Sequence, residues 1–318
     1  MKKLSVVFLA SGPFALPALH HVLGRADGEL LVVSQPDRPA GRGKSERATA
    51  AAESVASKTE LVKSPNVNAP AFIEGLRTRR FDLMLVCDFG QILKPALFEL
   101  PPLGCFNLHG SILPAYRGAA PIQRALLAGE LRTGVTLLRV NERCDAGPIV
   151  STIETDIGPA ENYGDLHGRL SDLAVRLLAP FLDQCVAGKL PPEHPQDESR
   201  ATMAPKIKKE ELHLDFSRPA AEIDRRVRAF APKPGAYAMW KGRRFKILKA
   251  ELERPPAPPP ASGAPGRIEV APDRRSLRVA CAGKTCLRLM DLQPEGGRVQ
   301  AAAEFVNGHP DLPGAVWV

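Results

Sequence analysis

The chain has 318 residues, of which 44% are hydrophobic and 25% charged, and its formal net charge is +8. This length allows two domains with separate cores, and the composition is that of a globular protein. No apolar run approaches the ~20 residues of a membrane span, and the run after Lys3 is shorter than the ~7–15 residues of a signal-peptide core. These features exclude a membrane-spanning chain, and we expect a cytoplasmic protein with no membrane partner.

The cysteines do not follow the pattern of a metal site. The six positions show no paired metal-ligand spacing and no neighbouring histidine pattern. We therefore expect buried free thiols in a reducing compartment and no bound metal. The positions are Cys87, Cys105, Cys144, Cys185, Cys281 and Cys286.

Apolar runs and helical patterns alternate through residues 1–190. This alternation predicts an α/β domain with a doubly wound, mostly parallel sheet. The first strand-to-helix turn, from Ala10 to Phe14, lacks Gly-x-Gly-x-x-Gly, so no dinucleotide site is expected. The expected strands are 4–9, 30–33, 83–87, 104–109 and 135–140, and the expected helices are 14–23, 45–52, 72–77 and 163–190.

Residues 191–207 are polar and rich in proline, which predicts a linker. Residues 208–318 begin with an expected helix at 220–230 and continue as short strands separated by Gly and Pro, which predicts a small β-barrel. This part holds about 20 Lys and Arg against about 13 Asp and Glu, an excess that favours a polyanionic partner. The alternative is an ordinary solvated basic face.

A polar pair lies at the end of the strand expected at 104–109. Asn107 and His109 are two residues apart, so their side chains leave the same face of a strand. Gly110 and Pro114 then turn the chain toward a helix beginning near Pro121. Open α/β sheets keep their active sites at such carboxyl ends of strands.

These residue types suit acyl or formyl transfer. Asn107 can donate to a developing oxyanion, and His109 can donate to the same oxygen or shuttle a proton near neutral pH. Asp145 follows the strand expected at 135–140 and can return in space to pair with His109. The alternative is that Asn107 and His109 cap a strand end while Asp145 makes an Asx turn.

The whole string closely resembles the folate-dependent formyltransferases, most strongly over residues 105–150. The motifs that carry the resemblance are Asn107-Leu-His109-Gly-Ser111-Ile-Leu-Pro114, Tyr116-Arg117-Gly118-Ala-Ala-Pro121 and Asp145-Ala-Gly147. The resemblance implies a Rossmann-like catalytic domain over 1–190 and an OB-like tRNA-binding barrel over 208–318. It further implies transfer of a formyl group from 10-formyltetrahydrofolate to the amino group of initiator methionyl-tRNA. We expect the protein to be a monomer that uses no metal.

The resemblance also implies roles for individual residues. Asn107 and His109 would hold the oxyanion, while Asp145 would orient His109 and help to move the proton. The expected folate contacts are Ser111, Ile112, Leu113, Pro114, Gly90, Ile92 and Leu93. The expected tRNA contacts are Arg38, Arg42, Lys44, Lys206, Lys208, Arg225 and Arg228.

Several questions stay open at this point. Asp88 replaces a small residue of the family's folate motif and could face solvent or alter the pocket rim. Arg117 could point toward the tRNA or brace its own loop. Three other functions remain possible: formylation of an amino sugar or other small amine, hydrolysis that releases formate, and RNA binding without catalysis. The basic second half and the loop at 35–44 argue against the small amine.

Overall fold

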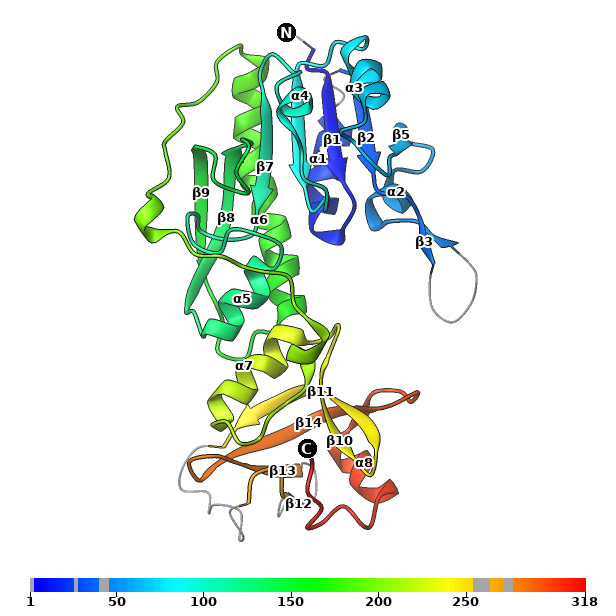
Figure 1. Cartoon of the computed structure of the whole chain (residues 1–318), viewed down its shortest axis with the longest axis vertical. Helices are drawn as coiled ribbons and strands as arrows, with labels where there is room; N and C mark the ends of the chain where they lie inside the picture. Colours follow the sequence, from blue (N-terminus) through cyan, green and yellow to red (C-terminus); the bar gives the residue numbers. More distant parts are fainter. Residues whose placement is uncertain (1–2, 26–27, 40–45, 254–263, 271–276) are drawn as a thin grey trace. The chain divides into compact units, whose positions relative to one another are not determined.

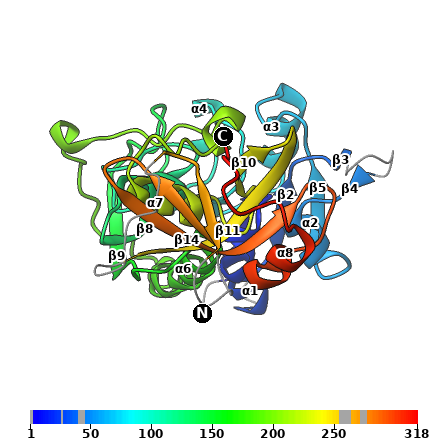
Figure 2. The ribbon, with the colours of Figure 1, turned by 90° about the horizontal axis from the view of Figure 1, so that it is seen from below.

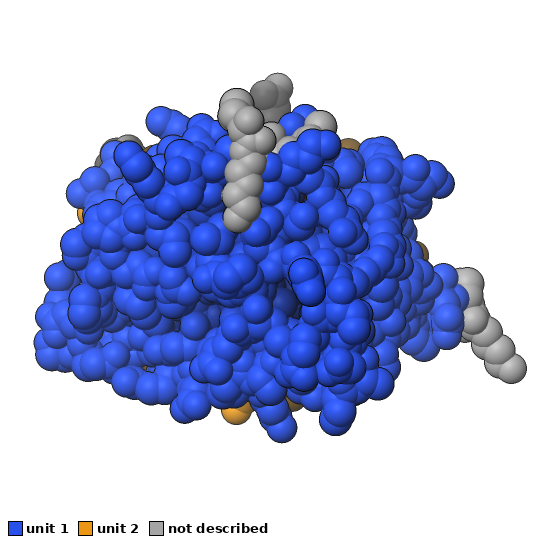
Figure 3. Space-filling view, turned by 90° about the horizontal axis from the view of Figure 1, so that it is seen from above, with its two compact units in different colours: residues 1–121, 132–156, 167–205 blue, residues 122–131, 157–166, 206–318 orange. Residues whose placement is uncertain are grey.

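The computed structural model describes residues 3–25, 28–39, 46–253, 264–270 and 277–318 (Figure 1). These residues form two compact units, coloured separately in Figure 3. Unit 1 comprises 1–121, 132–156 and 167–205, and unit 2 comprises 122–131, 157–166 and 206–318. The expected division at 190 and 207 stays a prediction.

The core of unit 1 is a seven-stranded sheet in the order β5-β2-β1-β6-β7-β8-β9. Its strands are β1 Val6–Ala10, β2 Leu30–Ser34, β5 Glu60–Lys63, β6 Leu83–Cys87, β7 Cys105–His109, β8 Arg132–Arg139 and β9 Ile149–Asp156. The strands from β5 to β7 pair in parallel, whereas β8 and β9 are antiparallel to their neighbours. The doubly wound, mostly parallel sheet is therefore confirmed.

Helices cover both faces of this sheet, so β1 and β6 are buried at every position. On one face, Val7 and Met84 share a core with α3 and α4. On the other face, Phe106 of β7 packs against Phe181 of α6, with ring centroids 4.7 Å apart. The helices that begin in this part of the chain are α1 Leu16–Arg25, α2 Ala50–Val55, α3 Pro70–Arg77, α4 Pro95–Phe98 and α6 Tyr163–Val186, of which residues 163–166 belong to unit 2.

Two helices differ most from their expected bounds, whereas α1 and α3 differ by about two residues at an end. The helix expected from residue 45 begins at Ala50, because Thr49 caps it by accepting from the Ala52 N–H at 3.2 Å. Before it, β4 Glu46–Arg47 pairs with β3 Arg38–Pro39 as a short hairpin. The helix expected to reach 190 stops at Val186, since Gly188 adopts a φ of +72° that ends a helix.

Unit 2 holds an antiparallel sheet in the order β10-β11-β14-β13-β12, with β15 added to β14. Helix α7 packs on β11, and α8 packs against β14 (Figure 2). The strands are β10 Ala236–Trp240, β11 Arg243–Leu252, β12 Ile268–Val270, β13 Leu277–Cys281, β14 Thr285–Pro294 and β15 Gln300–Ala301. The helices are α5 Pro121–Ala128, all but its first residue in unit 2, α7 Ala220–Phe230 and α8 Ala302–Gly308.

The C-terminal segment fills the gap between the two end strands of this sheet. On one side, the Val318 N–H donates to the Met239 carbonyl of β10 at 3.0 Å. On the other side, the Trp317 N–H donates to Gly266 and the Ile268 N–H of β12 donates to Ala315, both at 2.8 Å. The segment therefore completes a barrel-like ring of backbone hydrogen bonds, as expected of a small barrel.

No helix in the described ranges combines the length and the apolar character needed to span a bilayer.

Candidate active site

The structure brings Asn107, His109 and Asp145 together at the carboxyl end of β7. Asn107 Nδ2 donates to Asp145 Oδ1 at 3.1 Å, and His109 Nδ1 lies 3.6 Å from Asp145 Oδ2. Asn107 and His109 share one face of β7 because of the two-residue spacing. Asp145 lies in the loop between the antiparallel strands β8 and β9, and β8 pairs directly with β7.

Further donors hold the Asp145 carboxylate in place. The Gly118 N–H donates to Oδ2 at 2.9 Å, and the Cys144 thiol points to the same oxygen at 3.4 Å. Partial desolvation of the thiol group and the neighbouring Asp145 charge raise the pKa of Cys144 to about 11, so the thiol stays protonated at neutral pH. Cys144 is exposed, whereas the other five cysteines are buried as expected.

His109 is buried and both its ring nitrogens face oxygen atoms. Its side chain is only 6% exposed. Nε2 lies 2.9 Å from the Tyr116 carbonyl oxygen, and Nδ1 faces Asp145. A carbonyl oxygen can only accept, so Nε2 carries a proton in this geometry. The two contacts together fix the orientation of the ring.

The two residues whose oxygens face His109 have unusual backbone conformations. Tyr116 has a φ of +63° and Asp145 a φ of +49°, both in the left-handed region. Such conformations cost about 1–3 kcal/mol each outside glycine and persist only where the surroundings fix them. They are therefore a sign that this geometry is built for a function.

A pocket opens beside Asn107 and Asp145. Its apolar lining includes Ile92, Leu93 and Val140. Ile92 is 79% exposed, so its side chain is accessible to a ligand in this pocket. A pocket with apolar walls and a polar end is suited to a flat heterocycle that carries hydrogen-bonding groups.

The loop that carries Ile92 is held by side chains from elsewhere in unit 1. Gln35 Nε2 donates to the Phe89 carbonyl at 2.6 Å, and Gln91 Nε2 donates to the Ser64 carbonyl at 2.9 Å. Gly90 has a φ of +83°, and a Cβ there would lie 2.6 Å from the Gln35 amide nitrogen. Of the expected folate contacts, Ile92 and Leu93 line the pocket and Gly90 shapes the loop.

The other expected folate contacts lie after β7 and do not line that pocket. The Ser111 hydroxyl is buried and donates to the Ala115 carbonyl at 2.7 Å. Leu113 is buried, and its N–H donates to Thr136 at 3.2 Å. Ile112 and Pro114 are half-buried. A folate role for this run stays a prediction.

Asp88 is exposed, with a φ of +48°, and its side chain folds over the first turn. Its Oδ2 accepts from the Phe14 N–H at 3.2 Å, and its backbone carbonyl accepts from Ser11 and Gly12. A Cβ at Gly12 would lie 1.8 Å from Asp88 Oδ2. The glycine in the first turn therefore leaves the room that the Asp88 carboxylate occupies.

The expected tRNA contacts differ in their surroundings. Arg38 is exposed in β3 and donates to Gln35. Lys206 and Lys208 are exposed. Arg225 and Arg228 are half-buried, and Arg228 Nε is bonded to Asp224 at 2.8 Å. Arg42 and Lys44 lie outside the described residues.

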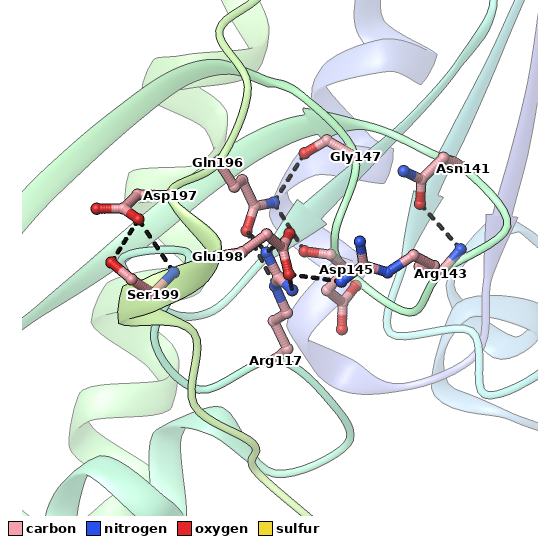
Figure 4. Close-up of polar contacts among 9 residues, drawn as sticks. All are labelled: Arg117, Asn141, Arg143, Asp145, Gly147, Gln196, Asp197, Glu198 and Ser199. Atoms are coloured by element: carbon pink, nitrogen blue, oxygen red, sulfur yellow. Dashed lines mark hydrogen bonds and ion pairs between the residues drawn. The ribbon is translucent and has the colours of Figure 1, made fainter.

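Arg117 braces its own loop and is only 4% exposed. It donates to Gln196 Oε1 at 2.7 Å and to Glu198 Oε1 at 2.9 Å (Figure 4). Hydrogen bonds from Arg117 and then Arg143 lower the pKa of Glu198 to about 2. Sequence reasoning missed Gln196 and Glu198, because they lie in the segment expected to be a linker.

Comparisons with known proteins identify the class. The sequence matches the Formyl transferase family over residues 4–182 and the C-terminal domain of formyl transferases over residues 206–310. The chain therefore belongs to the formyltransferase family, which confirms the resemblance seen in its motifs.

The curated relatives are more specific. The methionyl-tRNA formyltransferase of Myxococcus xanthus is 39% identical over 316 residues, covering 99% of this chain and 98% of that protein. The methionyl-tRNA formyltransferase of Syntrophus aciditrophicus is 38% identical over 317 residues, covering 99% of each. The likeness to these proteins thus extends over both units.

Solved structures share the fold at lower identity. HypX from Aquifex aeolicus, in complex with tetrahydrofolic acid, has a TM-score of 0.67 at 16% identity, over 98% of this chain and 48% of that one. The sugar 3N-formyl transferase WlaRD has a TM-score of 0.65 at 16% identity, over 90% of this chain and 97% of that one.

Proposed function

We propose that this chain transfers the formyl group of 10-formyltetrahydrofolate to the amino group of initiator methionyl-tRNA. The product is the N-formylmethionyl-tRNA used in translation initiation. The observation that carries the proposal is the convergence of Asn107, His109 and Asp145 beside an apolar pocket. The full-length relatives named methionyl-tRNA formyltransferase favour this acceptor. The protein would act in the cytoplasm, as a monomer.

The substrates fit what the residues offer. A free α-amine has a pKa near ~7.7–8, so a fraction of it is nucleophilic at neutral pH without a base. It attacks the formyl carbon, and the carbonyl oxygen becomes an oxyanion. Asn107 has two N–H groups, one of which is donated to Asp145. The second would stabilise the oxyanion, an interaction worth about 3–4 kcal/mol for one such donor.

The proton moves in the next step. The attacking amine loses a proton as its bond to the formyl carbon forms, and the folate nitrogen gains one as its bond breaks. His109, held between Asp145 and the Tyr116 carbonyl, is placed to carry that proton. An acid–base group of this kind contributes about 10²–10⁴-fold to the rate. Ile92 and Leu93 would contact the folate ring in the pocket.

A direct assay tests the proposal. The protein is incubated with 10-formyltetrahydrofolate and either initiator or elongator methionyl-tRNA, and the released amino acid is identified by mass spectrometry. Formylmethionine from the initiator tRNA is expected. A parallel reaction with amino-sugar nucleotides must be much slower, and formate released without tRNA would point to a hydrolase instead. Sedimentation of the same sample measures its oligomeric state.

A further inference from the structure

The segment 193–204, which we call the strap, crosses the candidate active site of unit 1. At its start, Glu193 pairs with Arg139 at 2.6 Å, and His194 exchanges backbone hydrogen bonds with Ile149 at 2.8 Å. These contacts fasten the strap to β8 and β9. A plain linker would not be expected to make them.

Gln196 is the point where the strap meets the Asp145 loop (Figure 4). Its Nε2 donates to the backbone carbonyls of Asp145 at 2.8 Å and Gly147 at 2.7 Å. Its Oε1 accepts from Arg117 Nε at 3.0 Å and from Nη2 at 2.7 Å. The amide therefore uses both of its donors and its acceptor, and it links the loop after β7 to the loop after β8.

Glu198 adds a second link between the same two loops. It accepts from Arg117 at 2.9 Å and from Arg143 at 2.5 Å. Arg117 belongs to the loop that follows His109, and Arg143 to the loop that carries Asp145. The carboxylate therefore ties together the two segments that meet at the site.

Thr202, near the far end of the strap, binds Tyr116, which is one of the two residues that face His109. The Tyr116 N–H donates to Thr202 Oγ1 at 2.9 Å, while the Tyr116 carbonyl lies 2.9 Å from His109 Nε2. The Arg117 N–H donates to the Thr202 carbonyl at 2.9 Å, and the Ala204 N–H donates to the Arg117 carbonyl at 2.6 Å. Both His109-facing residues, Tyr116 and Asp145, are thus bonded to the strap and both have left-handed backbones.

We propose that Gln196 and Arg117 are positioning residues for formyl transfer, which set the Asp145 loop against His109 through the strap. The inference rests on the proposed function. The reason is geometric: the carboxylate of Asp145 is aimed by its backbone, and that backbone is fixed by the Gln196 amide. A displacement of about 1 Å at a reacting group can cost about 100-fold in rate.

The test separates positioning from binding and from stability. Gln196→Glu keeps the oxygen that accepts from Arg117. It replaces the NH₂ group that donates to the Asp145 and Gly147 carbonyls with a second oxygen, which repels both. We expect kcat to fall about 100-fold, with KM for 10-formyltetrahydrofolate and for methionyl-tRNA changed by less than about twofold. The melting temperature is measured on the same samples. Gln196→Met, which has a similar length and no donor, carries the same expectation should Gln196→Glu not fold.

Ser199→Ala is the matched control in the same segment. It removes the hydroxyl that donates to Asp197 at 2.6 Å and touches neither loop of the site. Its kcat should equal that of the wild type. The inference is overturned if a folded Gln196 variant keeps its kcat, or if both KM values rise while kcat holds. A wild-type protein that does not formylate methionyl-tRNA overturns the proposed function instead.

Discussion

At the residue scale, the site depends on the Asp145 carboxylate, which has four polar groups around it. Asn107, Gly118 and Cys144 point at Asp145, and His109 lies beside it. The carboxylate can satisfy this many donors because its two oxygens accept at several positions. An amide in place of this carboxylate would point an N–H group at the N–H donors of Asn107 or Gly118. Asp145 is thus the residue on which the geometry of the trio depends.

We expect Asn107→Ala, His109→Ala and Asp145→Asn each to abolish most turnover in a folded protein. The loss should be about 10²–10⁴-fold, from the missing oxyanion donor or the misplaced acid–base group. Single-turnover rates with methionyl-tRNA measure it, and circular dichroism checks the fold. Asp183→Asn, on the exposed side of α6, serves as a control. A variant with a normal rate would remove that residue from the mechanism.

Gly12 and Asp88 form a second pair that can be tested at this scale. Gly12→Ala would place a Cβ 1.8 Å from Asp88 Oδ2, so the carboxylate must leave the Phe14 N–H. We expect a loss of about 1–3 kcal/mol from this overpacking. The double variant with Asp88→Ala should recover much of it. Urea unfolding of the wild type, the two single variants and the double variant gives the coupling energy. If the stability losses of the single variants simply add in the double variant, the two residues are not paired.

At the element scale, two short segments outside the α-helices and strands connect other parts of the fold to each other. The strap joins the loops at the end of β7 and β8, and the C-terminal segment joins β10 to β12. The C-terminal segment acts through its backbone carbonyls and N–H groups, whereas the strap acts mainly through the side chains of Gln196 and Glu198. Both also carry a buried contact that fixes them, such as the stacking of Trp317 on Phe245 at 5.6 Å.

Trp317→Ala should therefore weaken unit 2 as a whole. The indole is 1% exposed and packs against Phe245 and Phe305, so its removal leaves a large cavity. We expect a loss of about 3–5 kcal/mol in the free energy of unfolding. Val318→Ala, whose side chain is 64% exposed, should change stability by less than about 0.5 kcal/mol. Equal stability of the two variants in urea would show that the segment does not hold the barrel.

At the scale of the whole molecule, charge is unevenly divided along the chain. The excess of Lys and Arg after residue 207 suits a phosphate backbone, and binding of this kind weakens as salt rises. The cations expected to contact tRNA include exposed lysines and an arginine that is already paired with an acidic residue. Lys206 and Lys208 are exposed, whereas Arg228 is committed to Asp224.

These surroundings predict different outcomes for different cations. Lys206→Ala and Lys208→Ala should raise KM for tRNA, spare KM for folate, and lower the slope of log affinity against log salt by about 0.7–0.9 for each phosphate that the lysine neutralises. Arg228→Ala should instead destabilise the protein by about 1–3 kcal/mol, because it leaves Asp224 without its partner. Lys189→Ala, an exposed lysine of unit 1, is the control. An unchanged salt slope in both lysine variants would exclude them from the tRNA surface.

Local patterns in the sequence determined much of this protein. The buried runs of β6 and β7 and the helix at 220–230 follow from hydrophobic periodicity, which depends only on neighbouring residues. The motifs from Asn107 to Pro121 and from Asp145 to Gly147 were enough to indicate the family and the candidate trio. The antiparallel edge strand β9 was missed, because its alternating, half-exposed residues give a weak signal.

Only the tertiary structure decided how these parts meet. The 38 positions that separate Asn107 from Asp145, and the 51 that separate Asp145 from Gln196, are bridged by single hydrogen bonds. The C-terminal segment was not predictable, because it binds through backbone groups that every residue carries. The strap was not predictable, because Gln196 and Glu198 bind partners that lie far from them in the sequence. Arg117 shows the same limit: its sequence motif allowed a role in binding or in bracing, and only its burial against Gln196 and Glu198 chose between them.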